Sequence, residues 1–225
     1  MIEELDLLAP RAAIPSLEAF YGGRLKLPLQ RRGDGLELRV GRTRVRFAAA
    51  PPNTEPWYHV ALRLPAARFD PAYTWLRERV EVLEDHRGDR ITVFDRIGAV
   101  ACYFHDPAMN LMELISFHDL DRSENDGPFE ARELLGVAEA GLISPDPKAV
   151  AGTLRQEAGI EVWSGTVDEP GRLAFAGGRG HSLILGPSSR PWLPQGRISE
   201  AHPLRAVVDG VELDYDGIEK VSIRR

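Results

Sequence analysis

Apolar and polar residues alternate over short stretches of the first 120 residues, and a segment of helical spacing interrupts them. Residues 4–9 place leucines on one face of an extended chain and acidic residues on the other, which predicts a half-buried strand. Apolar residues at helical spacing over 14–21, followed by a Gly-Gly pair, predict a helix that ends there. Three short alternating strands, separated by glycine turns, are expected next, over 25–30, 36–40 and 43–48.

The same order of strand, helix and three strands begins again after a Pro-Pro-Asn breaker. These elements are expected over 58–65, 69–80, 90–95, 99–104 and 110–116. The offset between the two copies is 55 residues, both from Glu4 to His59 and from Phe20 to Trp75. One register shared by a strand and a helix indicates a duplication.

A weaker third copy is expected after the polar linker 119–128. Its strand, helix and short strands are expected over 138–144, 146–158, 161–165, 171–177 and 181–186. The chain from 187 to 203 has the composition of a loop, and the residues after it indicate a partial fourth unit. We therefore expect an α+β fold in which residues 1–120 hold two paired βαβββ modules, which form a curved sheet around a cleft. Residues 130–225 hold the degenerate third module and the partial fourth.

Composition narrows the classes of function. The chain has 225 residues, a net charge of −6 and a single cysteine. The negative charge argues against a nucleic-acid partner, and one cysteine cannot form an intramolecular disulfide. The apolar run over 97–104 is far shorter than the ~20 residues of a membrane span, and the acidic start is unlike a signal peptide. We expect a cytoplasmic protein with no nucleic-acid or membrane partner.

Four motifs accompany the doubled order: Phe20-Tyr21, Gly41-x-Thr43-x-Val45-x-Phe47, Tyr58-His59-Val60-Ala61-Leu62, and the stretch from Tyr103 to Glu113. With them, roughly residues 2–118 resemble the vicinal-oxygen-chelate superfamily, which includes glyoxalases, extradiol dioxygenases and fosfomycin or bleomycin resistance proteins. Members often carry Asp-Pro-x-Gly-Asn followed by Glu three residues later. Here Met109 stands at the glycine position, so the geometry of this turn could differ from that of the family.

The resemblance implies a cup with a divalent metal ion at its floor, and a small-molecule substrate that chelates the ion through two adjacent oxygens. In metal-using members the ligands come from the first and last strands of each module. Those positions fall here on Glu4, the Arg44–Arg46 region, His59 and Glu113. His59, Glu113 and Glu4 are therefore the implied ligands, with Asp6 as the alternative to Glu4.

An imidazole with carboxylates suits Fe(II), Mn(II), Zn(II) or Ni(II). The resemblance thus favours a metal-dependent enzyme, a lyase or oxidoreductase of the glyoxalase or dioxygenase type. The other interpretation is that His59 is a hydrogen-bonded strand histidine and Glu113 a salt-bridged glutamate. Glu4 could also be simply exposed.

Arg44 and Arg46 lie on the fourth ligand strand, where a metal-dependent lyase would carry a carboxylate. Val45 and Phe47 take the core side, so both arginines are expected to point toward the cup. They could bind an anionic substrate, neutralise Glu113 and leave the cup metal-free, or face solvent on an edge strand.

The alternative function is therefore a metal-free small-molecule binding protein of the resistance type, with Arg44 and Arg46 as its ligand contacts. Arg63, on the same face of its strand as His59, is a further candidate for substrate binding.

Tyr103 and His105 share one face of their strand just before the Asp-Pro turn. Either could donate a proton to an oxyanion formed at the metal, or Tyr103 could pack against the sheet. Glu139 stands at the first-strand position of the third module, but its closing strand carries no acidic residue, so no ligand pair is expected there. Because an unpaired module cannot bury its own sheet edge, we expect the third module to cover the cup or to pair across a homodimer.

Overall fold

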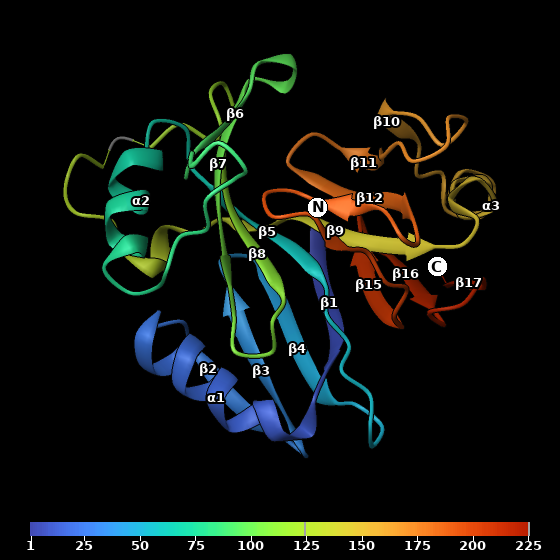
Figure 1. The fold of residues 1–225 in the computed structure, drawn as a ribbon, viewed down its shortest axis with the longest axis horizontal. Coiled ribbons are helices and arrows are strands. Elements are labelled where there is room, and N and C mark those ends of the chain that lie inside the picture. Colours follow the sequence, from blue (N-terminus) through green and yellow to red (C-terminus); the bar gives the residue numbers. More distant parts are fainter. Residues whose placement is uncertain (124, 225) are drawn as a thin grey trace.

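The computed structural model describes residues 1–123 and 125–224, and it has the α+β fold expected from the sequence (Figure 1). In this part of the chain, fifteen strands join in one mixed sheet and two more form a small separate hairpin. The helices are few and short. Among the described residues, no helix is both long and apolar enough to cross a membrane.

The first module consists of β1 (Ile2–Ala9), α1 (Ile14–Glu18), β2 (Leu29–Arg32), β3 (Gly35–Val40) and β4 (Thr43–Ala49). A wider helical segment, Ala19–Arg24, continues α1. As the alternation predicted, Leu5 and Leu7 are fully buried in the core, whereas Glu4 and Asp6 on the opposite face are half-buried.

The second module consists of β5 (His59–Leu64), α2 (Phe69–Arg77), β6 (Thr92–Phe94), β7 (Ala99–His105) and β8 (Leu111–Phe117). The third consists of β9 (Gly136–Ser144), α3 (Pro147–Thr153), β10 (Val162–Gly165), β11 (Ala174–Gly178) and β12 (His181–Pro187). The remaining strands are the hairpin β13 (Pro191–Trp192) and β14 (Arg197–Ile198), followed by β15 (Leu204–Val208), β16 (Val211–Tyr215) and β17 (Val221–Arg224). A helical segment, Leu154–Ala158, continues α3, and one-turn helices span Arg11–Ala13, Asp95–Ile97 and Ala131–Glu133.

The modules pair differently from the expected arrangement. The first strands of the second and third modules, β5 and β9, are antiparallel neighbours, and their eight strands run in the order β6-β7-β8-β5-β9-β12-β11-β10. The first module pairs through β1 with β15, and thereby with β16 and β17. The two halves of the sheet meet where Ile2 opposes Val137.

Residues 1–120 therefore do not form a cup by themselves. Each of the two expected domains, 1–120 and 130–225, contributes strands to both halves of the sheet. The physical reason is that alternation fixes which face of a strand is buried but not which strand lies at its edge. The third module covers its edge with β5 of the same chain.

The turn between β7 and β8 keeps the Asp-Pro motif in place. Asp106 Oδ1 accepts hydrogen bonds from two backbone N–H groups of the turn, at 2.9 and 3.0 Å. Its Oδ2 accepts the hydroxyl of Tyr21 at 2.7 Å, which ties the first module to the second. Met109 has a φ of 62°. The turn thus keeps the left-handed conformation that glycine adopts most readily, with a side chain that disfavours it.

Candidate functional site

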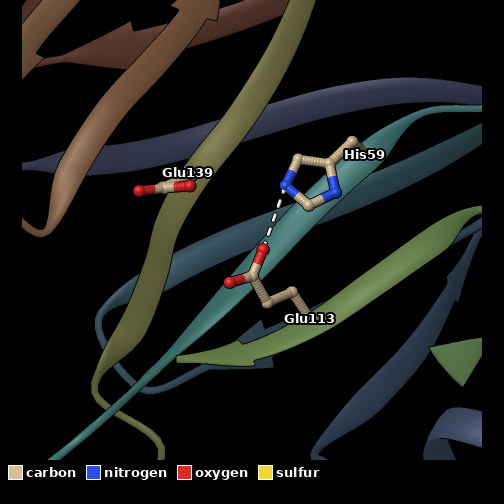
Figure 2. Close-up of side chains that lie close together, drawn as sticks. All are labelled: His59, Glu113 and Glu139. Atoms are coloured by element: carbon tan, nitrogen blue, oxygen red, sulfur yellow. Dashed lines mark ion pairs between the residues drawn. The ribbon is translucent and has the colours of Figure 1, made fainter. Parts of the chain in front are cut away.

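Three ionisable side chains from neighbouring strands converge on one face of the sheet (Figure 2). His59 begins β5, Glu113 lies on the parallel neighbour β8, and Glu139 lies on the antiparallel neighbour β9. Ala61 is opposite both glutamates, and His59, two residues earlier on the strand, faces the same side. Because residue 61 has only a methyl side chain, the space between the two carboxylates stays open to the imidazole.

The three side chains are close enough to share one ion. His59 Nε2 lies 3.3 Å from Glu113 Oε2, and one ligand atom from each residue lies within 4.8 Å of the others. Two atoms that bind one ion at about 2.1 Å can be at most about 4.2 Å apart, so small side-chain rotations bring the set to ligand distances. The group is a candidate metal centre of one imidazole nitrogen and two carboxylate oxygens.

All three side chains are buried, with exposed fractions of 4% for His59, 3% for Glu113 and 5% for Glu139. Burial raises the pKa of Glu113 to about 8, although the Tyr103 hydroxyl favours its charged form. Burial and the charge of Glu113 raise the pKa of Glu139 to about 8. Burial lowers the pKa of His59 to about 4, although Glu139 favours its protonated form. Without a cation, the group is therefore neutral near pH 7.

No charged basic side chain in the described part of the chain compensates either carboxylate. Within the described residues, the basic group beside Glu113 is the imidazole of His59, which is neutral near pH 7, and Glu139 has no ion-pair partner. Buried carboxylates usually have a charged partner or coordinate a metal. The donor chemistry therefore fits a divalent cation, which would supply the missing positive charge.

Aromatic side chains hold the imidazole of His59. The ring of Trp192 stacks on it with centroids 4.7 Å apart and an interplanar angle of 29°, and Tyr103 lies 6.5 Å away. The backbone N–H of Tyr58 donates to Asn110 Oδ1 at 2.8 Å, which fixes the start of β5. These contacts hold the imidazole beside Glu113, whereas its buried Nδ1 has no hydrogen-bond partner among the described residues.

A cavity of about 100 Å³ adjoins the three side chains. Its walls are mostly apolar and include Phe94, Phe175 and Ile184. On β8, Glu113 is opposite Ala61, the residue two positions after His59. The equivalent position of the third module is Ile184 on β12, which is opposite Gly141, two positions after Glu139. The place that would hold a fourth ligand is therefore apolar and borders the cavity.

Of the two predicted proton donors, only Tyr103 lines this cavity. Tyr103 is opposite Glu113 across β7 and β8, and burial together with that charge raises the pKa of its hydroxyl well above the usual range. His105 lies at the end of β7, with Nδ1 3.3 Å from the carbonyl oxygen of Asn110. The two side chains share a face, as expected, but two residues along a strand separate them by about 6.6 Å.

Glu4, the third ligand implied by the resemblance, lies in the other half of the sheet. Arg205 and Arg44 donate to its carboxylate, the former at 2.8 Å, and lower the pKa of Glu4. The reason is that β1 pairs with β4 and β15 rather than with β5. Glu139 stands where Glu4 was expected. Asp6 is also bound by these two arginines.

The arginines proposed as ligand contacts do not line the cavity. Arg44 is bound by three carboxylates of its own half of the sheet, those of Glu4, Asp6 and Glu37. Arg46 lies on the same strand, β4. Arg63 pairs with Asp121 and donates to the carbonyl of Gly180 at 2.9 Å.

The cavity is instead lined by Arg190 and Trp192, which come from a segment that the sequence predicted only as a loop. No periodic pattern marks these two residues. Glu139 did carry a signal, because it occupies the first-strand position of its module.

No family model matches the sequence, and no curated protein matches it. A Bacillus subtilis protein provisionally named a dioxygenase matches in structure with a TM-score of 0.55 and 17% identity, over 82% of this chain and 63% of its own. This chain thus spans less than two thirds of that protein. A lactoylglutathione lyase from Agrobacterium tumefaciens matches with a TM-score of 0.42 and 19% identity, over 52% of this chain and 92% of its own. The first match confirms the glyoxalase- and dioxygenase-like fold expected from the sequence, and at this identity it shows the fold alone.

Proposed function

We propose that this protein is a metal-dependent enzyme that acts on a small molecule bearing two adjacent oxygens. The observation that carries the proposal is the buried group of His59, Glu113 and Glu139, in which one ligand atom of each residue lies within 4.8 Å of the others. Burial disfavours the charged carboxylates, and a divalent cation would restore the charged form. The group would then bind the ion rather than repel it.

The donor set restricts the ion. One imidazole and two carboxylates suit Fe(II), Mn(II), Zn(II) or Ni(II). Three protein ligands leave positions for a substrate, as in catalytic metal sites. Ile184 is apolar and supplies no fourth ligand on its side of the group.

Such an ion, when bound, supplies Lewis-acid or oxygen-activating chemistry. The chain's own residues supply the rest. Tyr103 keeps the proton on its hydroxyl, because its pKa lies well above the usual range, and it can donate that proton in a hydrogen bond either to Glu113 or to an anionic substrate oxygen. The apolar walls exclude water, which strengthens that hydrogen bond. Burial keeps His59 neutral, the form that binds a metal.

The test is metal uptake by the purified protein after chelation and reloading near neutral pH. We expect one divalent ion per chain, and loss of that ion in His59→Ala. Glu4→Gln is a matched control, because Glu4 is also a carboxylate on a first strand but lies outside the group, and it should keep the ion. Equal metal content in His59→Ala and the wild type would contradict the proposal.

A metal-free binding protein is the second candidate function. The apolar cavity supports it, because the walls remain suited to a small ligand whether or not an ion is present. Arg44 does not support it, since three carboxylates already bind its guanidinium. Thermal shifts caused by a ligand in excess EDTA, together with no metal uptake, would favour this function.

A further inference from the structure

Among the described residues, Arg190 is the arginine that lines the cavity beside His59, Glu113 and Glu139. It is half-exposed, whereas His59, Glu113 and Glu139 are buried. Arg190 therefore stands at the outer end of the cavity and the three candidate ligands stand at its inner end. Its guanidinium lies 5.9 Å from the ring centroid of Trp192, the residue that stacks on His59.

No carboxylate of the described residues neutralises Arg190. Its Nε donates to the carbonyl of Gly171 at 2.9 Å and its Nη1 donates to the carbonyl of Pro191 at 2.8 Å. Within the described residues, Nη2 makes no hydrogen bond and no acidic group pairs with the guanidinium. Arg44 and Arg63, by contrast, both pair with carboxylates. The two backbone contacts orient the guanidinium of Arg190 and leave its charge available.

The surroundings of Arg190 favour an anion. Burial and the nearby charge of Arg172 lower the pKa of Arg190, so a negative group beside it would stabilise the charged form. Arg172 itself is exposed and pairs with Glu169 at 3.5 Å. Arginine binds carboxylates through parallel N–H donors, and Nη2 is one such donor.

We propose that Arg190 binds the anionic group of the substrate. The substrate would then be a short acid with the acid group at one end, the reacting oxygens at the other end and an apolar part between them. The proposal rests on the proposed function, because it assigns the inner end of the cavity to those oxygens. The cavity of about 100 Å³ is smaller than an engineered cavity of about 150 Å³ that binds benzene. The apolar part inside the cavity is therefore shorter than a six-carbon ring.

Isobutyrate and isobutyramide are matched probes, because they share a shape and differ in charge. Their binding is measured on the metal-free protein, at constant ionic strength, from the fluorescence of Trp192 and the other tryptophans. We expect the wild type to bind isobutyrate about tenfold or more tightly than isobutyramide, since hydrogen bonds to charged groups are stronger than neutral ones. Arg190→Gln should bring that ratio close to one, and Arg190→Lys should keep part of it.

Arg172→Gln is the matched control, because it removes the same charge nearby from an exposed residue outside the cavity. It should keep the preference for isobutyrate. If Arg190 serves only to hold the backbone of Gly171 and Pro191, Arg190→Gln will weaken both probes equally and leave their ratio unchanged. That result overturns the proposal, as does a wild type that binds neither probe.

Repeating the measurement with Mn(II) separates this proposal from the proposed function. A preference that appears only with the metal and survives in Arg190→Gln means that the carboxylate binds the ion, which overturns the role of Arg190. If the protein takes up no metal but the wild type still prefers isobutyrate and Arg190→Gln does not, Arg190 keeps its role. The metal-dependent function then fails alone.

Discussion

The metal-free protein should lose stability as the pH rises from 6.5 to 8. Burial raises the pKa of Glu113 to about 8, and burial with the charge of Glu113 raises that of Glu139 to about 8. In the unfolded chain both carboxyl groups ionise near pH 4.3, so above that pH the folded state holds protons that the unfolded state has released. Stability is therefore fully retained at low pH and falls as the pH rises toward the folded pKa values.

His59 has the opposite effect in a separate range of pH. Its pKa is lowered to about 4, so it destabilises the fold only below the unfolded value of about 6.5. Between pH 6.5 and 8 the folded-state histidine is neutral, and only the half-protonated histidine of the unfolded chain still loses its proton. This raises stability by about 0.4 kcal/mol, so the two carboxyl groups dominate the slope. Each contributes a loss of about 1.4 kcal/mol per pH unit.

Over this range each carboxyl group accounts for about 2 kcal/mol, and the pair for about 2–4 kcal/mol, because the first charge disfavours the second. The assay is urea unfolding in EDTA at pH 6.5 and 8. Glu113→Gln combined with Glu139→Gln should remove the fall, since a neutral amide has no proton to lose. Adding Mn(II) to the wild type at pH 8 should restore its stability, because the ion binds only the folded state.

Glu4→Gln is the control for this experiment. Arg205 and Arg44 hold the pKa of Glu4 below its usual range, so Glu4 is ionised in both states throughout the window and its contribution there is constant. The variant should show the same fall as the wild type. If the wild type and the double glutamine variant lose equal stability between pH 6.5 and 8, the buried carboxyl groups are not held neutral and the reasoning is refuted.

Two further substitutions test single contacts. Tyr103→Phe removes the hydroxyl that favours the charged form of Glu113, so the carboxyl group should ionise at higher pH, which a carboxyl-carbon NMR titration measures; an unchanged titration would mean that the hydroxyl does not reach Glu113. Met109→Gly should stabilise the fold by up to about 1 kcal/mol in urea unfolding, because Met109 is 50% exposed and has a φ of 62°. A loss of stability would show that the methionine side chain packs more strongly than its exposure indicates.

The sequence predicted the elements because they depend on local patterns. Alternation in β1 correctly placed Leu5 and Leu7 in the core, and the repeat offset correctly paired the first strand and helix of two modules. Which module lies beside which is decided by contacts between distant strands, such as those of β5 with β9. No local pattern encodes that choice, so the cup was assigned to the wrong pair of modules.

The pairing of distant strands also explains which residues of the candidate site could be predicted from the sequence. His59 and Glu113 belong to one module, whose parallel neighbours β5 and β8 bring them together, and this pairing follows from the repeat. Glu139 comes from a different module and joins them only because β9 lies beside β5. Glu139 was not predicted as a ligand because the closing strand of its own module carries no acid. The group instead takes His59 and Glu139 from two first strands and Glu113 from a last strand. Trp192 and Arg190, from the irregular segment after β12, have no pattern that could have indicated them.

The two halves of the sheet stabilise their acidic side chains in opposite ways. In one half, Glu4 on β1 receives two guanidinium groups, from Arg44 and Arg205, and remains half-exposed. In the other half, Glu139 on β9 and Glu113 on β8 are buried with a neutral imidazole and no basic partner among the described residues. A buried carboxylate is stable only when a positive charge compensates it. In the first half, arginine side chains of the same chain supply the positive charge. The second half lacks such side chains among the described residues, so its carboxyl groups must either bind a cation or be protonated. The pH and the metal concentration together determine which of the two occurs.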